Sequence, residues 1–150
     1  MEQSVYIIKP EGMLLRNAIR QMILSAGLSV ADFYTVMIPR WVPAVLYPSL
    51  SREDGEIWRI TCEHLINKKC EIGIVRGERA IERLVAVCGA ETNPMQCDPL
   101  TVRGLFGEKT PIELAGGERY WLNAIHRSKN HEEVLRDAKI HFALRSSGSC

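Results

Sequence analysis

Strand-like and helix-like hydrophobic patterns alternate along the chain. Residues 4–9 are rich in β-branched and aromatic side chains, which is typical of a strand, and Pro10 ends that strand because it lacks a backbone N–H. From Met13 to Ala26 apolar residues recur at helical spacing, and Gly27 supplies the left-handed residue that commonly closes a helix. The chain is therefore expected to open with a strand followed by a helix.

The alternation continues through the middle of the chain, where prolines interrupt it once. Pro39, Pro43 and Pro48 divide the segment after the second strand, so we expect a loop with about one helical turn there. An amphipathic pattern, a short β-rich run and another clear helix come next. In order, the expected elements are a strand over residues 28–38, the loop over 39–53, a helix over 54–67, a strand over 70–75 and a helix over 78–88.

The last third of the chain combines a long irregular segment with a final strand and helix. Residues 89–118 hold five of the eleven glycines and three of the seven prolines, and a loop of this length usually carries function. A strand over 120–125 follows, and Asn130 with Glu133 begins a helix in the manner of a capping box. The side chains expected to face the core from this helix are Val134, Leu135, Ala138, His141 and Phe142, and residues 145–150 are expected to form a frayed tail.

The order of these elements predicts a single α/β domain that spans residues 1–150. A chain of this length buries enough surface to form a stable core without disulfides or metals. The pattern alone leaves the order of the strands open, and it equally permits a small doubly wound sheet.

The charge balance narrows the choice of partners. Nineteen Lys and Arg against eighteen Asp and Glu leave a net charge of +1, which removes the general attraction that a non-specific nucleic-acid or membrane-surface binder requires. An anionic ligand must therefore be held by a local cluster of cations. The longest uncharged runs, residues 21–31 and 41–51, are far shorter than the ~20 apolar residues of a membrane span.

Cysteine usage and the first residues of the chain favour a soluble protein of the cytoplasm. The five cysteines are an odd number without a Cys-x-x-Cys pair, which indicates reduced thiols rather than a disulfide framework or a zinc site. The chain begins without the basic region of a signal peptide. His64, His131 and His141 lack the spacing of metal ligands, so no protein-bound metal is expected.

Three short segments carry residue types suited to phosphate chemistry. They are Tyr-Ile-Ile-Lys-Pro-Glu-Gly over residues 6–12, Glu-Thr-Asn-Pro over 91–94 with Pro-Leu-Thr-Val-Arg-Gly over 99–104, and Asn-Ala-Ile-His-Arg-Ser over 123–128. In their order, and in the spacing between Thr92 and Arg103, they resemble the nucleoside diphosphate kinase family over roughly residues 4–143. The joint occurrence of all three segments makes the resemblance specific.

This resemblance implies both a fold and an activity. The implied fold is a ferredoxin-like α/β sandwich, a four-stranded antiparallel sheet covered by helices. The implied activity is transfer of the γ-phosphoryl group of ATP to a nucleoside diphosphate, by a ping-pong route through phosphohistidine. Mg²⁺ would be bound through the nucleotide phosphates rather than by protein ligands. The protein would assemble as a homo-oligomer, either a hexamer or a tetramer.

His126 is the expected nucleophile. Phosphoryl transfer passes through a loose transition state, which needs an in-line nucleophile and neutralisation of charge more than covalent help. With an ordinary pKa of ~6.5, about three quarters of an imidazole is neutral at pH 7 and able to attack. By the resemblance, Asp137 stands where the family has a glutamate, one methylene longer, that helps to orient this histidine, and Ser128 adds a hydrogen bond behind it.

The resemblance also assigns the nucleotide contacts. Lys9 and Asn123 would contact the ribose hydroxyls, and Lys9 would also reach phosphate. Thr92 and Arg103 would hold the phosphates. Arg83 is the candidate for a second phosphate-binding arginine.

Several features depart from the family pattern. Arg127 follows the histidine where the family usually has glycine, and residues 104–122 form a longer segment than usual. No tyrosine aligns near the histidine, and in place of the aromatic residue that stacks on the base, Ile57 or Trp58 stands nearest. Two alternatives therefore stay open: a catalytically impaired relative that binds nucleotides or acts as a regulatory or scaffold protein, and a ferredoxin-like nucleic-acid or regulatory module, which the near-neutral charge disfavours.

Overall fold

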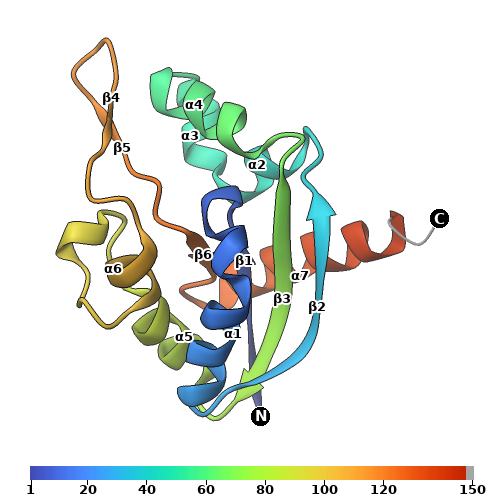
Figure 1. The fold of residues 1–150 in the computed structure, drawn as a ribbon. Helices are drawn as coiled ribbons and strands as arrows, with labels where there is room; N and C mark the ends of the chain where they lie inside the picture. Colours follow the sequence, from blue (N-terminus) through green and yellow to red (C-terminus); the bar gives the residue numbers. More distant parts are fainter. Residues whose placement is uncertain (148–150) are drawn as a thin grey trace.

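A four-stranded antiparallel sheet forms the centre of the computed structural model, which describes residues 1–147 (Figure 1). The strands lie in the order β2-β3-β1-β6, so β2 and β6 form the two edges. Helices cover the sheet, which confirms the ferredoxin-like sandwich and rules out a doubly wound parallel sheet. The strand bounds are β1 Glu2–Ile8, β2 Ser29–Met37, β3 Lys69–Gly77 and β6 Ile125–Arg127.

Close packing between the two central strands depends on a glycine. Tyr6 of β1 lies opposite Gly73 of β3 in the antiparallel register. The Tyr6 ring occupies the space of the missing side chain, because a Cβ at Gly73 would stand 2.4 Å from it. The Tyr6 hydroxyl donates to the buried Glu71 carboxylate at 2.8 Å, and Arg20 forms an ion pair with the same carboxylate. Ring, carboxylate and glycine therefore form one packed unit.

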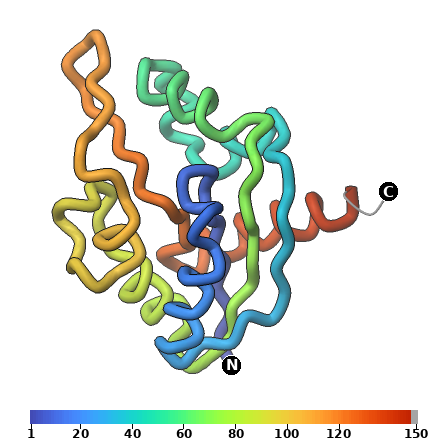
Figure 2. The backbone as a smooth tube through the Cα atoms, viewed as in Figure 1, coloured from blue at the N-terminus to red at the C-terminus, as the bar shows by residue number. Residues whose placement is uncertain are grey.

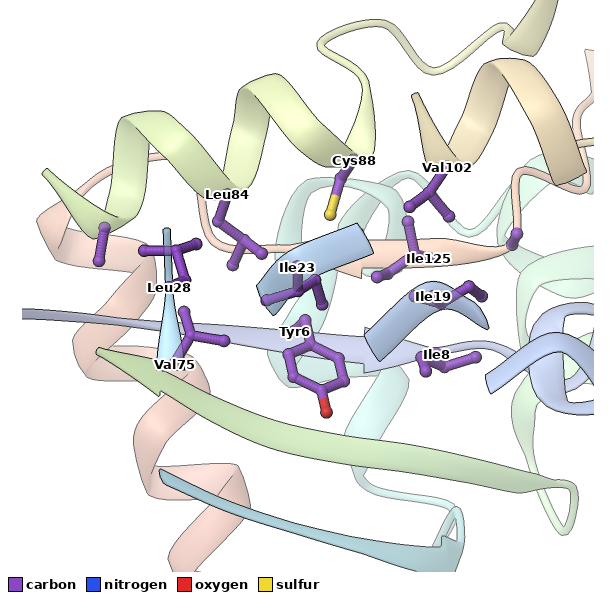
Figure 3. Close-up of a cluster of buried hydrophobic side chains, with 12 residues drawn as sticks. Tyr6, Ile8, Ile19, Ile23, Leu28, Val75, Leu84, Cys88, Val102 and Ile125 are labelled. Atoms are coloured by element: carbon purple, nitrogen blue, oxygen red, sulfur yellow. The ribbon is translucent and has the colours of Figure 1, made fainter. Parts of the chain in front are cut away.

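Two hydrophobic clusters occupy the two faces of the sheet. Most of the helical side chains in them come from α1 Arg16–Ser25, α2 Val42–Leu46, α5 Ala80–Cys88 and α7 His131–Ser147. On one face α1 and α5 pack against β1, and Ile23 and Leu84 lie near Tyr6 (Figure 3). On the other face Leu46 of α2 and Ile140 of α7 cover β1 and β3. The sheet is thus enclosed on both sides by helices from distant parts of the sequence.

Short helices replace the loop that the sequence predicts after β2. Residues 39–53 form two helices instead of one helical turn, because Pro43 and Pro48 each stand in the first turn of a helix, where a missing N–H breaks no hydrogen bond. The helix expected from Met13 is preceded by a 3-10 helix, η1, and the helix expected over 54–67 is shorter at both ends. The additional bounds are η1 Pro10–Leu15, α3 Pro48–Glu53 and α4 Glu56–Leu65.

The long segment over residues 89–118 also contains regular structure. Strands β4 and β5 pair in a separate hairpin, so the last strand of the main sheet is β6 rather than the expected strand over 120–125. This hairpin extends from the same end of the sheet as α3 and α4 (Figure 2). The remaining bounds are η2 Pro94–Gln96, α6 Val102–Phe106, β4 Ile112–Glu113 and β5 Arg119–Tyr120.

Helix α7 buries a different face from the one that the hydrophobic pattern predicts. Leu135 and Phe142 are 67% and 68% exposed, although both were expected in the core. Of the five side chains assigned to the core, only His141 is fully buried, and it is joined by Ile140 and Asp137. A buried carboxylate defines part of this face, and a hydrophobic pattern could not have selected it.

The end of α7 extends further than expected. Residues 145–147 continue the helix instead of fraying, and the rest of the expected tail, 148–150, lies outside the described residues. None of the helices formed by residues 1–147 combines the length and the apolar character that a membrane span requires.

Replacing Gly73 with Ala tests the packing of Tyr6 against β3. The new Cβ would stand 2.4 Å from the Tyr6 ring, and overpacking of this kind lowers the free energy of unfolding by about 1–3 kcal/mol. Gly55→Ala is the matched control, because nothing lies within 4 Å of a Cβ there. As an N-cap substitution, it should lower stability by about 1 kcal/mol or less. Urea unfolding measures both losses, and equal losses in the two variants would contradict the packing argument.

Candidate active site

A cavity of about 520 Å³ opens beside β6. Its walls come from the end of β1, the turn between α2 and α3, helix α4, the loop after α5, helix α6 and the segment from β5 to α7. Helix α4 and the β4–β5 hairpin, which extend from the same end of the sheet in Figure 2, both contribute side chains to this lining. The predicted site residues that line the cavity are Lys9, Ile57, Thr92, Arg103, Asn123 and His126.

Positive charge dominates the lining of the cavity. Six lining residues are Lys or Arg and one is Glu, although the net charge of the whole chain is only +1. Arg119, Lys129 and Arg136 each form an ion pair with a carboxylate. Within residues 1–147 the lining cations without a carboxylate partner are Lys9, Arg103 and Arg127. The cavity is therefore suited to an anion.

The Lys-Pro-Glu-Gly motif fixes the end of β1 against the approach to β6. The Lys9 backbone N–H donates to the carbonyl oxygen of Ala124 at 2.8 Å, and a Cβ at Gly12 would stand 2.7 Å from that same oxygen. The Glu11 carboxylate accepts a hydrogen bond from the Ala124 N–H at 3.2 Å. Ala124 has a left-handed backbone with φ of 74°, which these contacts hold in place. The motif glycine is required because two backbones approach closely.

Asn123, in the third sequence motif, connects it to the other two. Its Oδ1 accepts a hydrogen bond from Lys9 Nζ at 2.8 Å, and its Nδ2 donates to the carbonyl oxygen of Thr92 at 3.0 Å. Burial lowers the pKa of Lys9 to about 8, against the opposing effect of the Glu11 carboxylate. A buried ammonium is thus oriented at the cavity wall by a neutral amide.

Helix α6 places Arg103 at the edge of β6. The Thr101 hydroxyl caps this helix by accepting from the Gly104 N–H at 3.1 Å, and a Cβ at Gly104 would stand 2.1 Å from a carbonyl oxygen of the preceding loop. Arg103 then donates from Nε and Nη2 to the Ile125 carbonyl oxygen, at 3.2 and 2.8 Å. Burial, followed by the positive charge of Arg127, lowers the pKa of Arg103 to about 10.

A buried carboxylate holds His126. The imidazole is 7% exposed, and its Nε2 lies 3.0 Å from Oδ2 of the fully buried Asp137. The Ser128 hydroxyl donates to the same oxygen at 2.7 Å, and Arg136 Nε donates to the other oxygen at 2.8 Å. The structure therefore brings together the three residues predicted to act as nucleophile and support. The shorter aspartate side chain is long enough to reach the histidine.

These hydrogen bonds determine which nitrogen of His126 carries the proton. Burial by itself raises the pKa of Asp137. The hydrogen bond and charge of His126, together with the hydrogen bonds from Arg136 and Ser128, outweigh burial, so the pKa of Asp137 lies below its ordinary value. An ionised carboxylate can only accept, so Nε2 is the protonated nitrogen. Burial lowers the pKa of His126, although Asp137 opposes this shift. The neutral ring then has its lone pair on Nδ1, which no hydrogen bond within residues 1–147 occupies.

Tyr47 was missed in the sequence and lies directly against the histidine. The ring centroids of Tyr47 and His126 are 5.7 Å apart and their planes meet at 89°, so a tyrosine that the motifs could not align does lie beside the histidine. Tyr47 lines the cavity between α2 and α3. Burial raises the pKa of its phenol well above the ordinary range, which keeps the hydroxyl a neutral donor. The sequence signal that could have identified Tyr47 is its position directly before Pro48, the residue at which helix α3 begins.

Aromatic residues at the end of the β4–β5 hairpin line the cavity on the side of α4. Tyr120 stacks on His64 of α4, with ring centroids 5.6 Å apart and planes at 16°. Trp121 lines the cavity as well. From α4, Ile57 faces the cavity and Trp58 does not contribute to its lining.

Arg83 is the one predicted phosphate contact that the structure does not bring to the cavity. It lies on α5, and its Nη1 stands 3.0 Å from the position that a Cβ on Gly27 would take. Because Leu84 and Ile81 face the core on this helix, Arg83 is directed toward the turn between α1 and β2. The cavity contains Arg127 instead, at the position where the sequence departs from the family pattern.

The fold and the cavity together define an α/β sandwich with a cationic site built around a carboxylate-held histidine. A family model described as nucleoside diphosphate kinase matches residues 2–146. The chain therefore belongs to the nucleoside diphosphate kinase family, as its motifs indicated. No curated protein sequence matches the chain.

Solved nucleoside diphosphate kinase structures share the fold. A transition-state mimic of the Borrelia burgdorferi enzyme with bound vanadate and ADP has a TM-score of 0.79 and 21% identity, over 93% of this chain and 85% of that chain. The Encephalitozoon cuniculi enzyme has a TM-score of 0.76 and 25% identity, over 93% and 88%. A family protein from Babesia bovis has a TM-score of 0.76 and 21% identity, over 93% and 87%. The ferredoxin-like architecture is thus shared despite low identity.

Lys9→Met tests the desolvation of the buried ammonium. The pKa of Lys9 is about 8 in the folded protein against an ordinary 10.5, so between these values the unfolded chain binds more protons. The free energy of unfolding of the wild type should therefore rise with pH in this window, by up to about 1 kcal/mol per pH unit. Lys9→Met should lack this rise, whereas Lys68→Met, at an exposed position, should keep it. Urea unfolding from pH 7 to about 10.5 measures the three profiles, and parallel curves for wild type and Lys9→Met would refute the prediction.

Proposed function

We propose that the protein is an active nucleoside diphosphate kinase, which transfers the γ-phosphoryl group of ATP to a nucleoside diphosphate through phosphorylated His126. The observation that carries the proposal is the arrangement around this ring. Nε2 is held by Asp137, Nδ1 has its lone pair available, and three cations without carboxylate partners line the same cavity. Membership of the family supports the same activity.

In the first half-reaction Nδ1 of His126 attacks the γ-phosphorus of ATP. The N–P bond forms as the bond between the γ-phosphorus and the β–γ bridging oxygen breaks, and ADP leaves. Positive charge develops on the ring, and the ionised Asp137 stabilises it through the Nε2–H hydrogen bond. In the second half-reaction a terminal phosphate oxygen of another nucleoside diphosphate attacks the same phosphorus, the N–P bond breaks, and His126 returns to its neutral form.

The cations of the cavity neutralise the charge on the transferred group. A loose transition state spreads negative charge over the phosphoryl oxygens, so positioned cations supply most of the catalysis. Arg103 is aligned by the edge of β6 and Lys9 by Asn123, and both reach the phosphates in our proposal, with Thr92 adding a hydroxyl. Lys9 and Asn123 also contact the ribose.

The base is expected to lie between α4 and the hairpin. Ile57 lines the cavity from α4, and the hydroxyl-bearing Tyr120 lines it from the hairpin side. Ile57 and the ring face of Tyr120 offer apolar contact, which does not by itself select one base. The phosphates and the ribose therefore carry most of the binding energy.

Mg²⁺ takes part in the proposed reaction as an ion bound to the nucleotide. Within residues 1–147 no three His, Cys, Asp or Glu side chains gather into a group that could hold a metal ion, and Glu133 is the one carboxylate in the cavity lining. These residues fit a metal held by phosphate oxygens and water. When bound, the ion neutralises phosphate charge.

The protein is proposed to act as a cytoplasmic homo-oligomer, a hexamer or a tetramer. The family resemblance leads to this expectation.

A labelling experiment tests the nucleophile. Wild-type protein mixed with γ-labelled ATP and magnesium should acquire acid-labile, base-stable label, which a nucleoside diphosphate then removes. His126→Ala should acquire none, and His131→Ala, at a histidine that is exposed outside the cavity, should label as the wild type does. A folded wild type that binds ADP without labelling would favour the alternative of a catalytically impaired relative. Label that persists in His126→Ala would rule out His126 as the nucleophile.

Asp137→Asn tests the role of the carboxylate behind His126. Loss of the negative charge removes the group that stabilises the developing imidazolium, so kcat should fall by at least about tenfold. The pKa of His126 should also fall, because Asp137 now raises it against the effect of burial. Steady-state kinetics and an NMR titration of the imidazole measure the two effects, with Asp32→Asn as the control at a distant histidine contact. A folded Asp137→Asn variant with wild-type kcat and wild-type His126 pKa would show that the carboxylate has no such role.

A further inference from the structure

Arg127 is buried in the wall of the cavity without full hydrogen bonding. It belongs to β6, directly after His126, and lies opposite Tyr6 of β1 in the sheet. Its side chain is part of the cavity lining, and the residue is only 8% exposed. Nη2 donates to the Ala90 carbonyl oxygen at 3.0 Å, while the buried Nε has no hydrogen-bond partner. A buried guanidinium with an unused donor is costly unless a ligand completes its bonding.

A second guanidinium, that of Arg103, lies close enough to be affected by this charge. After burial, the charge of Arg127 is the largest influence that lowers the pKa of Arg103, and Arg127 also lowers that of Lys9. Within residues 1–147 every hydrogen-bond acceptor of the two arginines is a backbone carbonyl oxygen, and the four acceptors are those of Gly89, Ala90, Glu91 and Ile125. In the described part of the chain neither arginine has a carboxylate partner. Two buried like charges without a counterion are unfavourable in the free protein.

The chemistry of this pair identifies the class of ligand. Two planar guanidinium groups and an ammonium on one cavity wall match a chain of phosphate groups, because each guanidinium can donate to two oxygens and the summed charge is balanced by a di- or triphosphate. A carboxylate or a single phosphate would leave part of this charge unbalanced. Arg83 cannot share the role, because it faces the turn between α1 and β2.

We propose that Arg127 is a phosphate-binding residue of this protein, which together with Arg103 holds the polyphosphate of the bound nucleoside di- or triphosphate. The inference rests on the proposed function, because it takes the nucleotide to be the ligand of the cavity. His126 and Arg127 are neighbours in a strand, so their side chains leave the sheet on opposite faces. Both nevertheless line one cavity, because β6 is an edge strand. The phosphate chain would therefore lie across this edge, with the nucleophile on one side and Arg127 on the other.

A purely structural role for Arg127 makes a different prediction about stability. If the side chain served only to hold Ala90, its removal would lower the unfolding temperature of the ligand-free protein. If it serves to bind phosphate, its removal relieves repulsion with Arg103, and the ligand-free protein should unfold at the same temperature or higher. The rise in unfolding temperature caused by ADP should then become smaller, because the stabilisation by a ligand depends on its affinity.

The experiment compares ADP with adenosine, in the presence of magnesium, by titration calorimetry and thermal unfolding. For the wild type we expect ADP to bind much more tightly than adenosine. Arg127→Gln should weaken ADP binding by about 10- to 100-fold and leave adenosine binding within about twofold. Arg83→Gln is the matched control, an arginine outside the cavity, and should bind both as the wild type does. Arg127→Lys, which keeps the charge but loses the planar fork, should weaken ADP binding by a smaller factor.

The outcomes separate this proposal from the proposed function. If Arg127→Gln and Arg127→Lys keep the wild-type preference for ADP over adenosine, Arg127 does not bind phosphate, while the kinase proposal stands. If the wild type itself shows no preference for ADP, the nucleotide function and the role of Arg127 both fail. If Arg127→Gln does not fold, Arg127→Lys decides: a weaker preference for ADP supports the proposal, and wild-type affinity overturns it.

Discussion

The hydrogen bonds from Arg103 to the Ile125 carbonyl oxygen are the interaction on which the site depends. They occupy the free edge of β6, where a further strand would otherwise pair. The guanidinium of Arg103 is therefore held at Ile125, the residue directly before His126 in the strand. Two local contacts position α6 so that Arg103 reaches this edge. The Thr101 hydroxyl caps the helix, and the backbone at Gly104 packs closely against the preceding loop. An edge strand thus becomes the wall of a cationic cavity, and this also shields it from pairing with another chain.

The two faces of the sheet make different contributions to the site. The face covered by α7 supplies Asp137, which fixes the protonation of His126 from behind. The face covered by α5 supplies the loop whose carbonyl oxygens receive Arg103 and Arg127. Because β6 is short and lies at the edge, side chains from both faces reach one cavity. His126 and the two arginines are consequently held by contacts from opposite faces of the sheet.

The burial of positive charge opposes stability in the ligand-free protein. Lys9 and Arg103 both have lowered pKa values, chiefly because burial disfavours their charged forms. An anionic ligand would remove this penalty by supplying the missing counter-charge. Sites that are organised for function in advance commonly carry such a cost in the free state. The neutral amide of Asn123 and several backbone carbonyl oxygens reduce the cost while leaving the cations available.

The sequence by itself predicted the fold class of this protein and named the residues expected to carry its chemistry. Lys9, Arg103, Asn123 and His126 could be proposed as site residues because they stand in short motifs that resemble the family pattern, and local backbone contacts constrain such motifs, as Gly12 against Ala124 illustrates. The alternation of patterns also located the long strands and helices. Tertiary structure alone decided which face of α7 is buried, that Tyr47 lies against the histidine, and that Arg127 and not Arg83 reaches the cavity. These outcomes depend on contacts between segments far apart in the chain, and local hydrophobic periodicity contains no information about such contacts.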